Sequence, residues 1–215
     1  MKKTLTMTLF AMLFTAVVAT AAGRRAPETE EMPEEPEINA PAPDFNLPDL
    51  DGEEVTLSDF KGNYVVLEWI NYDCPFVVKH YGSGNMQSLQ DEYMDKGVIW
   101  LGIGSSAPGT QGYFSLQEWK ELAANRDSNP SHILLDPEGR VGRLYRARTT
   151  PQMFIINPEG ILIYMGAIDD NPSRDPEDIP ESINYVRKTL DAAMAGEPIE
   201  VQQTRPYGCS VKYAD

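Results

Sequence analysis

The pattern of hydrophobic and polar positions predicts an α/β protein. Residues 64–70 (YVVLEWI) and 98–105 (VIWLGIGS) are almost continuous apolar runs, which are typical of buried central strands. Residues 132–136 (HILLD) predict a third strand, and residues 151–169 predict a hairpin that turns at the NPEG sequence of residues 157–160. Strands that alternate with helices and end in an antiparallel hairpin predict an α/β sandwich.

The segments around these strands carry helix and turn signals. A helix is expected to begin at Pro75, a residue that suits the first helical turn, and the YGSGN sequence at residues 81–85 interrupts it. Residues 115–126 begin with the capping box of a further helix, and residues 175–196 predict a last helix that ends at a glycine. Ahead of all these segments, residues 49–57 (DLDGEEVTL) predict a β-hairpin with Asp-Gly at its turn.

The N-terminus has the pattern of a secretory signal peptide over residues 1–22. Lys2 and Lys3 precede an apolar stretch from Leu5 to Val18, and the small residues of ATAAG follow as a cleavage site. A retained membrane anchor is the alternative, although the apolar run is shorter than the ~20 residues that span a bilayer. We therefore expect a periplasmic or secreted protein with no membrane insertion after signal cleavage.

The rest of the chain divides into a linker, one domain and a tail. Residues 23–43 are rich in glutamate and proline and predict an extended linker, with an acidic docking arm as the alternative. Residues 44–196 are long enough for one domain with a hydrophobic core, and residues 197–215 follow as a tail. The formal net charge of −15 argues against nucleic acid and anionic membrane surfaces as partners.

Several segments together resemble a known family. The segment APDFNLPDLDGEEVTLSDFKGNYVVLEW precedes a cysteine, and TTPQMFIINPEGILIYMG follows it; DCPFVVKHY and the C-terminal GCSVKY are the two most specific motifs. Over about residues 41–195 the chain resembles the peroxiredoxin-like redoxins of the AhpC/TSA-type branch of the thioredoxin superfamily. The resemblance implies a thioredoxin-like fold, with a central mixed β-sheet flanked by helices and an N-terminal β-hairpin, and a thiol-based oxidoreductase activity.

Cys74 is the strongest candidate nucleophile. It follows a predicted buried strand, Asn71 and Asp73 give its surroundings a polar character, and Pro75 begins a helix directly after it. The amide N–H groups and the dipole of that helix favour the thiolate, which is the attacking form of cysteine. An inert buried cysteine is the alternative. A thioredoxin-type site would place a second cysteine where this chain has Val77.

The resemblance also implies a role for Thr150 and Pro151. In the thioredoxin fold this proline is cis, faces the active cysteine and shapes the substrate groove, whereas an edge-strand proline is the alternative reading. The usual peroxide-activating residues are missing, because Asn71 stands in place of a threonine and Pro151 in place of an arginine. Asn71 can still donate a hydrogen bond to a peroxide oxygen or to the sulfur.

Two further side chains are candidates for tuning the thiolate. Arg148, with Arg146 beside it, lies close before Thr150 and can supply positive charge, although two solvated arginines are the alternative. His80 follows Cys74 by six positions, which is too far along a helix to guarantee contact with the sulfur. A packing or surface role for His80 is therefore the alternative.

Cys209 is the candidate resolving cysteine. It lies 135 positions after Cys74, on a tail that is long enough to cross the surface and return. Two cysteines in an oxidising compartment tend to pair, and Cys209 would then replace the thiol that is missing at Val77 by attacking an oxidised Cys74. A purely structural disulfide and a bond between two chains are the alternatives.

The resulting expectation is a thiol redox enzyme that acts on a peroxide or a protein disulfide and is reduced by an unidentified thiol donor. A non-catalytic thioredoxin-fold binding module with a structural Cys74–Cys209 disulfide is the first alternative. A copper-handling chaperone that uses Cys74 and His80 is the second. We expect no cofactor and no resident metal, because the histidines and cysteines are scattered over positions 74, 80, 132 and 209.

Overall fold

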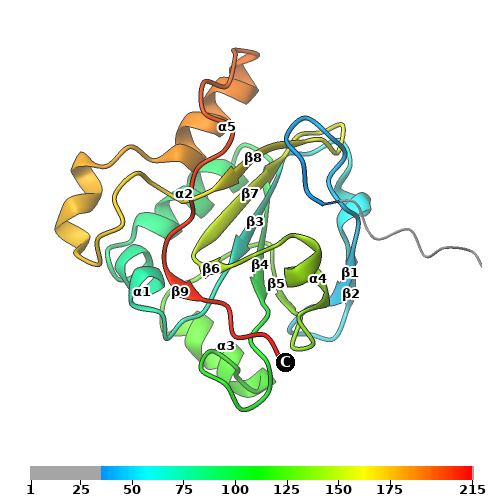
Figure 1. Ribbon diagram of the computed structural model, residues 1–215, viewed down its shortest axis with the longest axis vertical. Helices are drawn as coiled ribbons and strands as arrows, with labels where there is room; N and C mark the ends of the chain where they lie inside the picture. The colour runs from blue at the N-terminus through cyan, green and yellow to red at the C-terminus, as the bar shows by residue number, and fades with distance from the viewer. Residues whose placement is uncertain (1–34, 215) are drawn as a thin grey trace, which may run out of the picture. The chain divides into compact units, whose positions relative to one another are not determined.

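A mixed five-stranded sheet forms the centre of the computed structural model, which describes residues 35–214 (Figure 1). Its strand order is β5-β4-β3-β7-β8, with bounds β3 (Val65–Trp69), β4 (Ile99–Gly104), β5 (His132–Leu135), β7 (Gln152–Ile156) and β8 (Leu162–Gly166). Strands β3, β4 and β5 are parallel, whereas β7 and β8 are each antiparallel to their predecessor in this order. The expected α/β fold with a central mixed sheet is confirmed. The predicted signal peptide and the start of the predicted linker lie outside the described residues.

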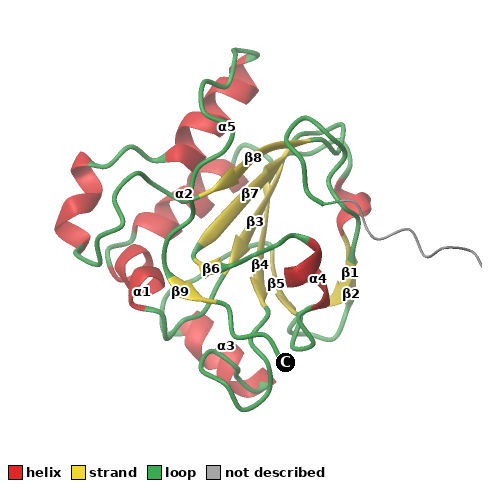
Figure 2. Ribbon diagram, viewed as in Figure 1, coloured by secondary structure: helices red, strands yellow, loops and turns green. Residues whose placement is uncertain are grey.

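Helices and a small hairpin cover the two faces of this sheet (Figure 2). One core cluster joins Val66 and Ile70 to side chains of α1 (Pro75–Gly82), α2 (Asn85–Met94), α3 (Leu116–Ala124) and α5 (Tyr185–Ala195). The other joins Val65, Leu67 and Trp69 to α4 (Arg140–Leu144), η1 (Leu57–Phe60) and the predicted N-terminal hairpin of β1 (Asn46–Pro48) and β2 (Glu54–Thr56). The apolar side chains of the run alternate between the two clusters, which explains why it is apolar on both faces except at Glu68.

Two helical segments are each divided in the structure. Gly84 adopts a left-handed conformation with φ of 76° between α1 and α2, as the glycines at 81–85 predict. The single last helix expected over residues 175–196 is instead a short 3-10 helix, η2 (Pro176–Glu181), followed by α5. The division arises because the side chain of Asn184 accepts the Arg187 N–H at 2.9 Å and starts a new helix. Within residues 35–214, no helix is both long and apolar enough to cross a membrane.

The two ends of the described chain are attached to the sheet. Residues 39–42, which the sequence assigns to the linker, make backbone hydrogen bonds with residues 160–162, so this part of the predicted linker belongs to the folded unit. At the other end the tail, shown in red in Figure 1, leaves α5 and returns across the molecule. Its strand β9 (Cys209–Ser210) pairs antiparallel with β6 (Thr149–Thr150).

Candidate active site

Cys74 occupies the N-cap position of α1, immediately after the loop that follows β3. The Asn71 carbonyl accepts the Cys74 N–H at 2.9 Å, and the Asn71 side-chain oxygen accepts the Asp73 N–H at the same distance. Pro75 is the first residue of the helix, as its fixed φ angle favours. Asn71, expected to hydrogen-bond a peroxide or the sulfur, therefore uses its oxygens to shape the turn that presents Cys74 to the helix N-terminus.

The Cys74 sulfur faces the loop between β6 and β7. Its Sγ donates a hydrogen bond to the Thr150 carbonyl at 3.0 Å, and the Thr150-Pro151 peptide bond is cis, as the family resemblance implied. The Thr150 hydroxyl is buried and has no hydrogen-bond partner among the described residues. Cys74 itself is 0% exposed, so its sulfur is covered in this arrangement.

The tail brings Cys209 to the same place. In the β6–β9 pair, Cys209 lies directly opposite Thr150, whose carbonyl accepts the Cys74 thiol. Burial raises the pKa of Cys209 to about 12, and its hydrogen bond and electrostatic interaction with Cys74 act in the same direction. Two residues separated by 135 positions in the chain are thus neighbours, and both are free thiols.

Gly208 permits the close approach of the tail to β6. Its φ is +134°, and a side chain at this position would place its Cβ 2.0 Å from the Thr150 carbonyl oxygen. Further backbone bonds hold the tail on either side, because Val211 donates to the Arg148 carbonyl at 2.9 Å and Ala107 donates to the Lys212 carbonyl at 2.7 Å. The tail is therefore held along the site by main-chain pairing.

His80 lies in the interior but is engaged with the tail. Its Nδ1 pairs with Asn85 Nδ2 at 2.9 Å, and its Nε2 lies 3.3 Å from the Tyr207 hydroxyl. Burial, and then the charge of Lys79, lower the pKa of His80 to about 3, so the imidazole is neutral. The 3.8 Å approach of His80 to Asp169 is consequently no ion pair. Both ring nitrogens are used away from Cys74, which favours a packing role over thiolate tuning.

The predicted arginines differ in their surroundings. Arg148 contributes its backbone to the site, through the carbonyl that binds the tail and an N–H that donates to Gln152 Oε1 at 2.9 Å. Arg146 forms an ion pair with Glu35. Arg146 and Arg148 also line a cavity of about 270 Å³. The cations that lower the pKa of Cys209 are instead Lys212 and Arg174, although burial outweighs them. Neither was singled out from the sequence.

Glu68, in β3, is a second buried titratable group. Its carboxylate accepts hydrogen bonds from Trp100 Nε1 at 2.8 Å and from the Tyr81 hydroxyl at 3.1 Å, and Gln90 Nε2 is 3.5 Å away. Burial raises the pKa of Glu68 to about 7, and these hydrogen bonds oppose the rise. The polar residue within an otherwise apolar strand was the sequence signal for this group.

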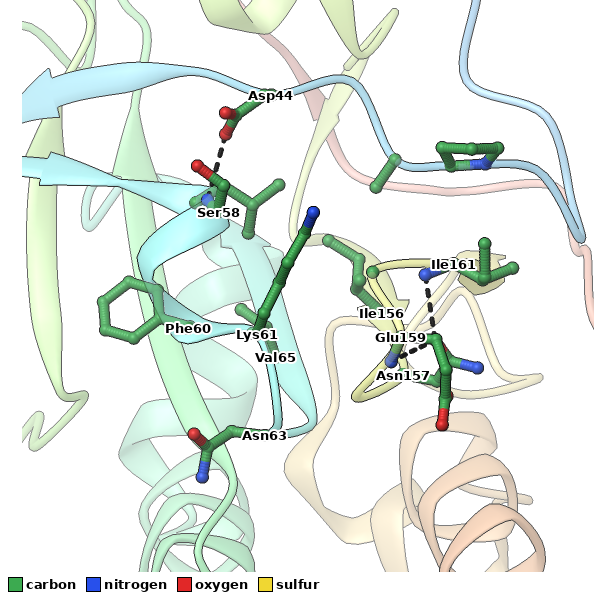
Figure 3. Close-up of a pocket in the computed structure, with 14 residues that line it drawn as sticks. Asp44, Ser58, Phe60, Lys61, Asn63, Val65, Ile156, Asn157, Glu159 and Ile161 are labelled. Carbon is green, nitrogen blue, oxygen red and sulfur yellow. Dashed lines mark hydrogen bonds between the residues drawn. The ribbon is translucent and has the colours of Figure 1, made fainter.

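Two cavities bear on how a substrate could reach Cys74. One of about 550 Å³ lies beside the tail, and its lining includes Thr149, Asp169, Tyr207 and Gly208. Another, of about 220 Å³, lies at the start of β3, where Figure 3 shows Lys61 across from Ile156. Because Cys74 follows the opposite end of β3, the second cavity is separate from the thiol site. Among residues 35–214, no group of three histidine, cysteine or acidic side chains is placed to hold a metal ion.

Comparison with known proteins places this geometry in a family. The model of the AhpC/TSA family matches residues 38–165, which is more than half of the chain. No curated protein matches the chain.

Solved structures share the fold. An uncharacterized conserved protein from Geobacillus kaustophilus is 29% identical, with a TM-score of 0.70, over 83% of this chain and 93% of that one. A hypothetical protein from Sinorhizobium meliloti 1021 is 24% identical, with a TM-score of 0.69, over 83% of this chain and 95% of that one. A thiol:disulfide interchange protein from Bacteroides sp. is 21% identical, with a TM-score of 0.53, over 75% and 95% of the two chains.

The family match agrees with the features of the site. Cys74 lies at a helix N-terminus, as the sequence predicted, and the cis Thr150-Pro151 pair lies beside it, as the resemblance implied. The chain therefore belongs to the AhpC/TSA family, a thiol–disulfide oxidoreductase family of thioredoxin-fold redoxins.

Proposed function

We propose that this protein is a periplasmic or secreted thiol oxidoreductase in which Cys74 is the nucleophile and Cys209 is the resolving cysteine. The observation that carries the proposal is the register of β9 on β6. It sets Cys209 opposite Thr150, and the carbonyl of Thr150 accepts the Cys74 thiol at 3.0 Å. A second thiol supplied by the tail takes the role that a Cys-x-x-Cys motif would give to position 77.

The first step is attack by the Cys74 thiolate. With a hydroperoxide, the sulfur takes the terminal oxygen, the O–O bond breaks, and the alcohol or water leaves after taking a proton; Cys74 becomes a sulfenic acid. With a disulfide substrate, the sulfur forms a mixed disulfide and one substrate thiol is released. The helix N-terminus at Cys74 favours the negative sulfur that both reactions need.

The second step is attack by Cys209 on the oxidised Cys74 sulfur. It expels water from the sulfenic acid, or the remaining thiol from the mixed disulfide, and leaves a Cys74–Cys209 disulfide that a thiol donor then reduces. The order of the steps follows from the state of Cys209, because burial raises its pKa to about 12, so Cys74 rather than Cys209 makes the first attack.

The test uses mass spectrometry of the reduced full-length protein before and after one equivalent of hydrogen peroxide or of a disulfide substrate. We expect a Cys74–Cys209 disulfide within one chain in the wild type. Cys209→Ser should stop at the sulfenic acid or mixed disulfide on Cys74, and Cys74→Ser should react with neither oxidant. The relative rates with the two oxidants identify the substrate class.

A non-catalytic binding module is the competing function. It requires a Cys74–Cys209 disulfide that resists mild reductants and the absence of redox activity that depends on Cys74. Either result would refute the proposed oxidoreductase. A Cys74–Cys209 disulfide that mild reductants open and that an oxidant forms again would refute the binding module.

A further inference from the structure

A buried polar cluster connects α1 with the tail that carries Cys209. We call it the clamp cluster, and it consists of Lys79, His80, Asn85, Asp169 and Tyr207. Lys79 and Asp169 are each 2% exposed and His80 is 0% exposed. Burying polar side chains costs free energy unless they form hydrogen bonds or ion pairs with one another. The contacts within the cluster are therefore what allows these groups to be buried.

The helix presents one face to a single tail residue. Phe76, Lys79 and His80 are spaced by three and four positions, and therefore lie on the same side of α1. The ring of Phe76 meets the ring of Tyr207 edge to face, with centroids 5.7 Å apart. The hydroxyl of the same tyrosine lies beyond the Phe76 ring, where it contacts His80 and Asp169.

The hydrogen bonds of the clamp cluster run in one direction. Asn85 Nδ2 donates to His80 Nδ1, so the proton of the neutral ring sits on Nε2 and faces the Tyr207 oxygen. Tyr207 in turn donates its proton to Asp169 Oδ1. Burial and the bond to Asp169 raise the pKa of Tyr207, which keeps this proton in place. Tyr207 is thus both an acceptor and a donor at one fixed point.

The charge of Asp169 is balanced by Lys79, whose Nζ lies 3.6 Å from Asp169 Oδ2. Lys79 also donates to the Asn171 carbonyl at 3.2 Å. A buried ion pair of this kind contributes little net stability, but removing a partner from it is costly. The role of this ion pair is to fix the position of the Asp169 carboxylate, which accepts the hydrogen bond of Tyr207.

We propose that Tyr207 is a positioning residue that delivers Cys209 to Cys74. This inference rests on the proposed function. Tyr207 precedes Cys209 by two residues, with only Gly208 between them, so an anchored Tyr207 restricts where Cys209 can lie. Tyr207 is fixed on α1, the same helix whose N-cap is Cys74. The clamp cluster therefore restricts where Cys209 can lie relative to Cys74.

The experiment compares Tyr207→Phe with Tyr93→Phe in the full-length protein. Tyr207→Phe keeps the ring against Phe76 and removes only the hydroxyl. Tyr93→Phe is the matched control, because its hydroxyl also donates to an aspartate, Asp191, at 2.8 Å, but between α2 and α5. Each reduced protein is mixed with hydrogen peroxide, quenched with a thiol-blocking reagent at successive times, and analysed by mass spectrometry.

We expect Tyr207→Phe to slow the closure of the disulfide without slowing the oxidation of Cys74. Oxidation of Cys74 should proceed in Tyr207→Phe at least as fast as in the wild type, whereas closure of the disulfide should slow about tenfold, the effect of losing one charge-assisted hydrogen bond. The sulfenic acid should persist, and an added small thiol should capture it as a mixed disulfide. Tyr93→Phe should close its disulfide at the wild-type rate.

Closure at the wild-type rate in Tyr207→Phe, or equal slowing in Tyr93→Phe, would overturn the positioning role. Absence of the disulfide in the wild type would instead overturn the proposed function, so the two failures are distinguishable. Circular dichroism checks that each variant is folded. If Tyr207→Phe is not, Phe76→Leu decides in its place: it keeps the hydrogen bonds but removes the ring that Tyr207 packs against, and unchanged closure there would refute the proposal.

Discussion

Glu68 shows how one residue responds to its position in the sheet. It is the polar member of β3, and its carboxylate is 0% exposed among Trp100, Tyr81 and Gln90. Burial disfavours the charged form and raises the pKa of Glu68 from its ordinary 4.5 to about 7. The folded protein therefore binds this proton more tightly than the unfolded chain does.

This linkage predicts a pH dependence of stability. The contribution of Glu68 is fully present below pH 4.5 and is lost as pH rises to about 7. At about 1.4 kcal/mol per pKa unit, the loss is about 3 kcal/mol. Glu68→Gln should remove it, so the free energy of unfolding of the wild type relative to this variant should fall across that window. Urea titrations at several pH values measure the difference, and parallel curves for the two proteins would contradict the prediction.

Strand β9 is the element on which the site depends. It occupies the edge of β6, next to Cys74, where the peptide groups of Thr149 and Thr150 would otherwise be free to pair with an extended substrate. Its approach requires Gly208, because any side chain there would meet the Thr150 carbonyl. A strand of two residues is held by few bonds, so it is suited to local opening.

Removal of this element should expose Cys74. A chain that ends at Thr204 lacks Tyr207, Cys209 and the pairing with β6, and its Cys74 should react with iodoacetamide at least about tenfold faster than in full-length Cys209→Ala. The full-length variant is the control because it lacks the same thiol but keeps the strand. Equal alkylation rates in the two folded proteins would show that the tail does not cover Cys74.

At the scale of the whole molecule, the two cysteines come from distant parts of the chain and lie at the same site. A bond between Cys74 and Cys209 would close a loop that contains β4, β5, β7, β8 and α5. In the chain-entropy model, a loop of this length stabilises the folded state by about 5 kcal/mol, by restricting the unfolded chain. Formation of this bond would therefore couple the redox state of the site to the stability of the fold.

This coupling predicts that oxidation raises the free energy of unfolding, by up to about 5 kcal/mol. Urea denaturation of the wild type with and without a reductant measures the difference. Cys209→Ser should show the same midpoint in both conditions. If the urea midpoint of the wild type is the same with and without reductant, an intramolecular Cys74–Cys209 bond is contradicted.

The local elements were largely predictable from the chain. The apolar runs at 64–70 and 98–105, the glycines at 81–85 and the Ser115 capping box all correspond to observed elements or breaks. The last helix was predicted as continuous over residues 175–196. Hydrophobic periodicity alone does not show that Asn184 caps the start of a separate helix. Residues 39–42 were predicted to belong to an extended linker, although they pair with residues far away in the chain.

The sequence by itself determined the fold class and the candidate cysteines, because strand periodicity, helix caps and short motifs are local in the chain. Only the tertiary structure decided that Cys209 lies opposite Thr150, that His80 faces the tail, and that Tyr207 and Asp169 complete the clamp cluster. These facts depend on pairing between segments separated by tens of residues. Such pairing is set by the packing of the whole sheet and its helices, which no local pattern specifies.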